Sequence, residues 1–86
     1  MQRWSPEIIR YLYTAADYSR YYQDLARQLG AFLRPEDRVC DAGCGLGLLS
    51  RALLPYCAHV TAVDRSPAAV AALRARGADP KLSALT

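Results

Sequence analysis

Three glycines at alternate positions, Gly43, Gly45 and Gly47, are the feature that most constrains the fold of this chain. They follow a short apolar run that ends at Asp41, and an apolar stretch with helical spacing comes after them. Glycine carries no side chain, so a ligand can lie against the backbone of such a turn. In open parallel sheets, a turn of this kind between a strand and its helix is where nucleotide-like ligands bind. The sequence therefore predicts an α/β fold with a nucleotide-type binding loop.

Apolar spacing around this loop predicts strands that alternate with helices. Strands are expected over residues 38–41 and 59–63, and a third between Leu82 and Leu85. One helix buries leucines at three- and four-residue steps until Pro55 stops it, and another runs from Pro67 to Gly77. Such alternation favours parallel pairing in a sheet layered with helices, which is a Rossmann-like arrangement.

Two helices are expected before this core. Ser5 and Pro6 are typical of a helix start, and this first helix should reach about Tyr13. A second, longer helix should end near Leu33, because a stripe of large side chains precedes that residue. The stripe consists of Tyr18, Tyr22, Leu25, Leu29 and Phe32. We therefore expect a helical cap over residues 1–34 and a partial Rossmann-like core over 35–86, within a single truncated domain.

Polar residues beside that stripe predict a solvated, ion-paired helix face. Arg20 can meet Asp24, and Asp24 can meet Arg27, because residues three or four apart are neighbours on a helix. The net charge of +3 comes from dispersed arginines, without the basic block typical of an arm that binds nucleic acid. Nucleic acid is therefore not indicated as a partner.

Composition favours a protein of the cytoplasm. No apolar run approaches the ~18 residues that a membrane span requires, and the N-terminus does not resemble a signal peptide. The three cysteines, Cys40, Cys44 and Cys57, are odd in number and lack a C-x-x-C pair, so neither a disulfide framework nor a metal site is indicated. We expect Cys40 and Cys44 to act as small buried apolar residues.

Asp41 favours a cationic ligand over a dinucleotide. The dinucleotide pattern G-x-G-x-x-G places Leu48 or Ser50 at its last position, so the match is imperfect. A carboxylate beside the loop would also repel a pyrophosphate, whereas it attracts the ammonium and sulfonium of S-adenosylmethionine. Asp64 ends the second strand. Its distance from the loop along the sequence is about that at which an acidic residue holds the ribose hydroxyls in dinucleotide-binding folds. That separation keeps a nicotinamide-dependent oxidoreductase fragment open as a less favoured alternative.

Two segments resemble motifs of the class I S-adenosylmethionine-dependent methyltransferases. Residues 39–47 (VCDAGCGLG) resemble the first motif of that family, and residues 60–64 (VTAVD) resemble its acidic motif after the second strand. The resemblance implies S-adenosylmethionine as cofactor, with Asp64 at the ribose. It implies cofactor contacts from Asp41, Gly43, Cys44, Gly45, Gly47, Asp64 and Arg65.

The aromatic side chains near the N-terminus allow a further expectation. In family members of this layout, helices before the first motif often fold over the cofactor, and an aromatic face near a sulfonium gains cation–π attraction. Tyr18 and Tyr22 are therefore candidates for an aromatic lid. Both also belong to the apolar stripe, and ordinary core packing is the favoured interpretation for them.

The resemblance also implies that the chain is the N-terminal portion of a larger fold. A class I methyltransferase sheet has seven strands, and the third and fourth strands and those after them carry most adenine, substrate and catalytic contacts. The catalytic residues and the methyl acceptor therefore stay unknown. The first strand is expected to present an unpaired edge, which natural proteins rarely leave open. The alternative function is a non-catalytic interaction module, in which this edge pairs with a second copy or with a C-terminal half.

Overall fold

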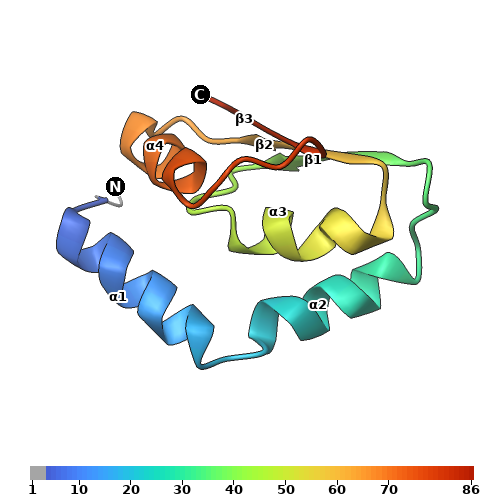
Figure 1. The fold of residues 1–86 in the computed structure, drawn as a ribbon, viewed down its shortest axis with the longest axis horizontal. Coiled ribbons are helices and arrows are strands. Elements are labelled where there is room, and N and C mark those ends of the chain that lie inside the picture. The colour runs from blue at the N-terminus through green and yellow to red at the C-terminus, as the bar shows by residue number, and fades with distance from the viewer. Residues whose placement is uncertain (1–3) are drawn as a thin grey trace.

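The computed structural model describes residues 4–86, and its elements follow the predicted order (Figure 1). The elements are α1 (Pro6–Asp17), α2 (Tyr21–Gly30), β1 (Arg38–Ala42), α3 (Leu48–Leu53), the 3-10 helix η1 (Leu54–Tyr56), β2 (His59–Val63), α4 (Pro67–Ala75) and β3 (Leu82–Leu85). The predicted α/β architecture, with two helices before it, is confirmed. None of the helices in this part of the chain has the length and apolar character needed to cross a bilayer.

The three strands form a parallel sheet in the order β1-β2-β3. Val39 lies opposite Val60, and Ala62 lies opposite Ala84. Because the strands are parallel, their carboxyl ends meet at one edge, where the glycine loop also lies. Within residues 4–86, β1 pairs only with β2, so the expected open edge of the first strand is confirmed.

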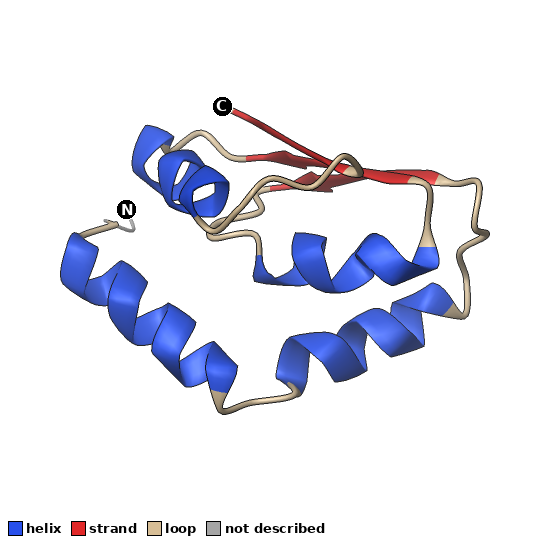
Figure 2. Ribbon diagram, viewed as in Figure 1, coloured by secondary structure: helices blue, strands red, loops and turns tan. Residues whose placement is uncertain are grey.

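Helices cover one face of the sheet. Right-handed connections in the order β1-β2-β3 place α3 and α4 on the same face of the sheet. Figure 2 shows α3 below the strands and α2 below α3. Alternate residues of β1 follow this asymmetry, because Val39 is partly buried while Cys40 is exposed. The expectation that Cys40 is buried is therefore wrong, since it points to the uncovered face.

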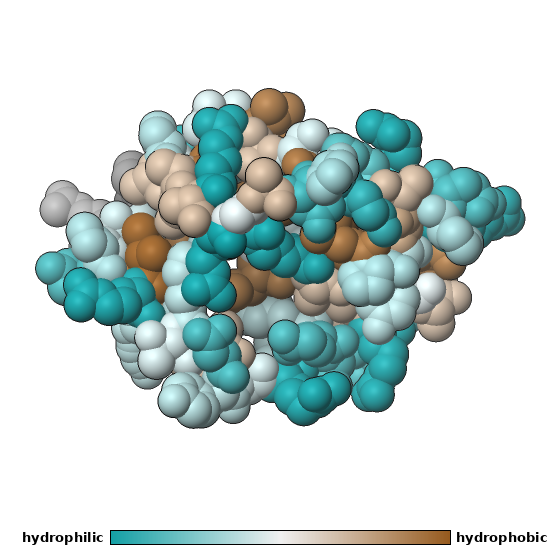
Figure 3. Space-filling view, in the orientation of Figure 1, coloured by the Kyte–Doolittle hydropathy of each residue, from teal (hydrophilic) through white to brown (hydrophobic). Residues whose placement is uncertain are grey.

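Two apolar clusters hold the helices on the sheet. The first lies between the sheet, α2 and α3, and its buried members are Ala26, Leu53, Cys57 and Val60. The second joins α1 to the glycine loop and α4, and its buried members are Tyr13, Leu46 and Ala69. Burial of a large apolar side chain contributes roughly 1.5–3 kcal/mol. Figure 3 shows apolar side chains in the hollow between the N-terminal helices and the rest of the molecule, and hydrophilic ones along α2.

The first helix begins as predicted and continues further than expected. The Ser5 hydroxyl accepts a hydrogen bond from the Ile8 amide at 3.2 Å, which confirms the helix start. The helix ends at Asp17 and not near Tyr13, because the intervening residues include alanines, which favour helix, and no breaker. A turn follows, in which the Ser19 hydroxyl accepts a hydrogen bond from the amide that opens α2.

The apolar stripe predicted for the second helix is only partly buried. Tyr18 precedes α2 and is 90% exposed, and Phe32 follows it and is 87% exposed. Because both residues lie outside the helix, helical periodicity no longer directs them toward the core, and the expectation of core packing for Tyr18 is wrong. The ion-paired face is confirmed, with Asp24 4.0 Å from Arg20 and 3.6 Å from Arg27.

Candidate functional site

The glycine loop between β1 and α3 is hydrogen-bonded to the end of the neighbouring strand. The amides of Gly43 and Cys44 both donate to the carbonyl oxygen of Val63, at 2.7 and 2.9 Å. Gly43 and Gly45 have φ angles of +72° and +56°, in the left-handed region that favours glycine. The end of β2 therefore fixes the shape of the loop. The positive φ angles disfavour residues other than glycine at these two positions.

The Asp64 carboxylate, just after β2, ties the loop to the start of α4. Its Oδ2 accepts a hydrogen bond from the Gly45 amide at 2.8 Å, and its Oδ1 accepts one from the Ser66 amide at 2.9 Å. Ser66 then caps α4 by accepting from the Ala69 amide at 3.2 Å, which agrees with the predicted helix start at Pro67. A carboxylate oxygen has two acceptor sites, so each oxygen of Asp64 can still accept from a ligand.

The carboxylate of Asp41, the next-to-last residue of β1, is held by a serine that was not predicted. The Ser50 hydroxyl donates to Asp41 Oδ2 at 2.6 Å, and Ser50 is fully buried. The sequence did carry a signal, because Ser50 lies four residues after Leu46 and three before Leu53, on the buried stripe. A polar side chain on such a stripe needs a hydrogen-bond partner, and Asp41 provides it.

Two cavities lie on either side of the glycine loop. We call the first the Asp41 cavity, of about 330 Å³, and the second the Asp64 cavity, of about 770 Å³. The Asp41 cavity is lined by Trp4, Leu12, Tyr22, Asp41, Gly43, Cys44, Gly45, Leu46, Leu48 and Leu49. The Asp64 cavity is lined by Trp4, Gly43, Gly45, Asp64, Arg65, Ser66 and Pro67. Apart from Gly47, all the residues predicted to contact a cofactor from the loop and from the end of β2 line one of these cavities.

Gly47 has a packing explanation in this structure. It lies outside the linings of both cavities, and a Cβ atom on it would be 2.3 Å from Cδ1 of the buried Leu73. Its φ of +76° also favours glycine. The glycine therefore allows the loop to approach α4, and a contact from Gly47 to a cofactor stays a prediction.

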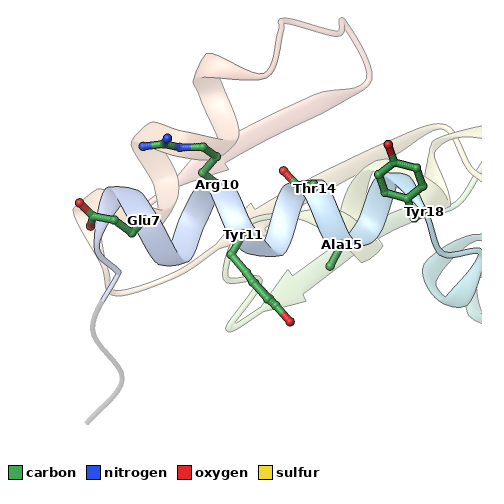
Figure 4. Close-up of a pocket in the computed structure, with 6 residues that line it drawn as sticks. All are labelled: Glu7, Arg10, Tyr11, Thr14, Ala15 and Tyr18. Carbon is green, nitrogen blue, oxygen red and sulfur yellow. The ribbon is translucent and has the colours of Figure 1, made fainter.

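The two tyrosines predicted as a lid lie in different places. Tyr22 lines the Asp41 cavity, whereas Tyr18 lines a separate hollow along the outer surface of α1, with Tyr11 and Arg10 (Figure 4). Trp4 also lies against the loop, because its Cζ2 would be 3.5 Å from a Cβ on Gly45. No local sequence pattern singles out Trp4. Tertiary packing of α1 brings it to the loop.

The carboxylates around the loop give it a negatively charged environment. Burial, followed by the negative charges of Asp41 and Asp64, raises the pKa of the Cys44 thiol to about 11. The thiol is therefore neutral near pH 7 and is not a ready nucleophile. The same two carboxylates favour a cationic ligand in the adjoining cavities.

Family and sequence comparisons place this loop among methyltransferases. Residues 39–86, from β1 to the end of the chain, match the family model described as a methyltransferase domain. A ubiquinone biosynthesis O-methyltransferase of Xylella fastidiosa strain 9a5c is 52% identical over 40 residues, which are 46% of this chain and 16% of that protein. The ribosomal RNA small subunit methyltransferase A of Thermobifida fusca is 47% identical over 49 residues, which are 57% of this chain and 17% of that protein.

Solved structures of methyltransferases share the fold. CalS10, an amino pentose methyltransferase of Micromonospora echinaspora solved with S-adenosylmethionine bound, superposes with a TM-score of 0.68 at 21% identity. That likeness covers 99% of this chain and 36% of CalS10. The 23S rRNA methyltransferase ErmE superposes with a TM-score of 0.63 at 30% identity, covering 76% of this chain and 26% of ErmE. The chain thus spans only part of the length of each of these proteins.

Proposed function

The chain belongs to the methyltransferase domain family, and from this premise we propose that it binds S-adenosylmethionine across the Asp41 and Asp64 cavities. Asp41 would attract the ammonium of the methionine portion, and Asp64 would accept hydrogen bonds from the ribose hydroxyls, with Arg65 beside it. Gly43, Cys44 and Gly45 would form the floor between the two carboxylates. Bound there, the cofactor would supply an electrophilic methyl group to a nucleophilic acceptor.

The hydrogen bonding of the loop amides is the observation that supports this ligand most. Gly43 and Cys44 donate to the Val63 carbonyl, and Gly45 donates to Asp64. A pyrophosphate is held by such amides, and here they are already engaged within the protein. A ligand without phosphate and with positive charge suits this loop, whereas a nicotinamide dinucleotide does not. A Cβ on Gly43 would meet nothing within 4 Å, so the space next to Gly43 is open to a ligand.

The methyl acceptor is left open. The matched relatives are named for ubiquinone biosynthesis and for ribosomal RNA, which differ entirely in chemistry. The reaction of the family is an in-line attack on the methyl carbon, in which positioning of the two reactants contributes much of the acceleration. Within this chain, the loop and its two carboxylates would orient the cofactor for that attack.

Calorimetric titration with S-adenosylhomocysteine tests the proposal. We expect the chain to bind it and Asp64→Ala to lose at least about tenfold in affinity, because hydrogen bonds to a charged group contribute ~1.5–3 kcal/mol each. Asp24→Ala is the control, since it removes an acidic residue that pairs with arginines on the outer face of α2. Thermal unfolding of each variant separates lost contacts from lost structure. Tighter binding of NADH, or no binding even with a C-terminal half of a relative supplied, would contradict the proposal.

A second candidate function is pairing through the open edge of β1. Within residues 4–86, β1 has a strand neighbour on one side only, and one of its faces, with Cys40 and Ala42, is exposed. Such an edge is a template for a further strand from a second copy or from another chain. Sedimentation at micromolar concentration tests it, because a folded monomer would count against self-association.

A further inference from the structure

Trp4 stands where the two cavities meet. Among residues 4–86, only Trp4, Gly43 and Gly45 line both the Asp41 cavity and the Asp64 cavity. The two glycines have no side chain, so the indole of Trp4 is the one side chain at the boundary in the described part of the chain. Its ring lies close above the loop, with Cζ2 3.5 Å and Cη2 3.7 Å from the position of a Cβ on Gly45.

The position of Trp4 is set by the packing of α1. Trp4 is partly buried and packs on the cluster of Tyr13, Leu46 and Ala69. The next residue, Ser5, caps α1, and its carbonyl accepts the first helical hydrogen bond from Ile9 at 2.9 Å. The indole is therefore held between a capped helix start and an apolar cluster, so its place above the loop does not depend on a ligand.

We propose that the indole ring of Trp4 is the group against which the sulfonium of S-adenosylmethionine lies, and that Trp4 selects the cationic cofactor over its neutral product. This inference rests on the proposed function. The sulfonium joins the methionine portion of the cofactor to its adenosine portion. With the first portion at Asp41 and the ribose at Asp64, the sulfonium crosses the boundary that Trp4 forms. A cation over an indole face is attracted by the ring, whereas the thioether of S-adenosylhomocysteine carries no charge.

The other aromatic side chains near the N-terminus do not share this position. Tyr22 lines the Asp41 cavity but not the Asp64 cavity. Tyr11 and Tyr18 line the outer hollow of α1 shown in Figure 4. The ring of Tyr13 already has a cation over it, because the guanidinium carbon of Arg76 lies 4.1 Å from its centroid. Trp4 is therefore the aromatic residue that the geometry assigns to the sulfonium.

The test compares the affinities of S-adenosylmethionine and S-adenosylhomocysteine in three variants of the 86-residue chain. In Trp4→Leu, the preference for the charged ligand should fall by about 2- to 30-fold, which is the range of a cation–π contact. Trp4→Phe keeps a weaker aromatic face and should fall in between. Tyr11→Leu is the control, since it removes an aromatic side chain from the outer hollow of α1. It should keep the preference of the unmodified chain.

Because Trp4 is the single tryptophan of the chain, its fluorescence gives a second readout without any substitution. Both ligands should change its emission, and the charged one should change it more. Equal losses for the two ligands in Trp4→Leu, or an emission unchanged by saturating ligand, would overturn the role of Trp4 and leave the proposed function standing. If the unmodified chain binds neither ligand, even with a C-terminal half of a relative supplied, the proposed function fails and the inference with it.

Discussion

Replacing Gly47 with alanine should destabilise the fold far more than the same change at Gly43. At Gly47 the new Cβ would lie 2.3 Å from Cδ1 of Leu73, which is fully buried and cannot turn toward solvent. Overpacking of this kind costs about 1–3 kcal/mol, and the left-handed backbone at +76° adds about 1–2 kcal/mol. The expected total of about 2–5 kcal/mol is a large part of the roughly 4–13 kcal/mol that holds a chain of this size folded.

Gly43→Ala is the matched comparison. Its φ of +72° is nearly the same, but a Cβ there meets nothing within 4 Å. Only the backbone strain of about 1–2 kcal/mol should appear. Urea denaturation followed by circular dichroism gives the free energy of unfolding for each variant. In Gly47→Ala combined with Leu73→Ala, the loss should be smaller than the sum of the single losses, because the clash has been removed. Equal costs at the two glycines, or strict additivity in the double variant, would refute the packing role of Gly47.

Two further predictions concern groups beside the loop. Tyr13→Phe removes a 3.0 Å hydrogen bond from the phenol to the Leu46 carbonyl and should cost about 1 kcal/mol near neutral pH. Burial raises the pKa of the Tyr13 phenol above 10.0. The neutral phenol therefore stabilises the fold fully below that pH, and this stabilisation is lost as the pH rises through the pKa of the folded state. The difference between Tyr13→Phe and the unmodified chain in urea should therefore narrow between about pH 8 and about pH 11, and a widening would contradict this. Because the pKa of the Cys44 thiol is raised to about 11, Cys44 should react with iodoacetamide more slowly than the exposed Cys40 at about pH 8. The rate at Cys44 should rise roughly tenfold for each pH unit up to its pKa. Equal rates for the two cysteines at about pH 8, measured by mass spectrometry, would contradict this.

The elements of the core could be predicted because their signals are local. Ser66 and Pro67 mark a helix start whose hydrogen bond the structure contains, and His59–Val63 forms a strand over the residues expected. Val70 and Leu73, three residues apart in the helix predicted from Pro67 to Gly77, are 1% and 0% exposed. In each case the neighbours in sequence determine the conformation, so no knowledge of the rest of the fold is required.

The N-terminal helices were predicted less well because spacing alone does not say what lies opposite a side chain. Tyr18 and Phe32 continue the periodicity of α2 but fall outside it. The same limit applied to the candidate site. Asp41 and Asp64 could be recognised from their places at strand ends. The buried stripe marked Ser50 as a side chain in need of a partner but did not name Asp41, and Trp4 reaches the loop through a contact that only the tertiary structure makes.

The carbonyl of Val63 has a consequence for how a ligand would be received. It accepts the amides of both Gly43 and Cys44, so the hydrogen bonding of the sheet continues into the loop. A loop that is ordered in this way loses little conformational entropy when a ligand arrives, and less of the interaction energy is spent on ordering. Binding can then proceed as docking onto a preformed surface, with solvent release and diffusion setting its pace more than any rearrangement of the backbone.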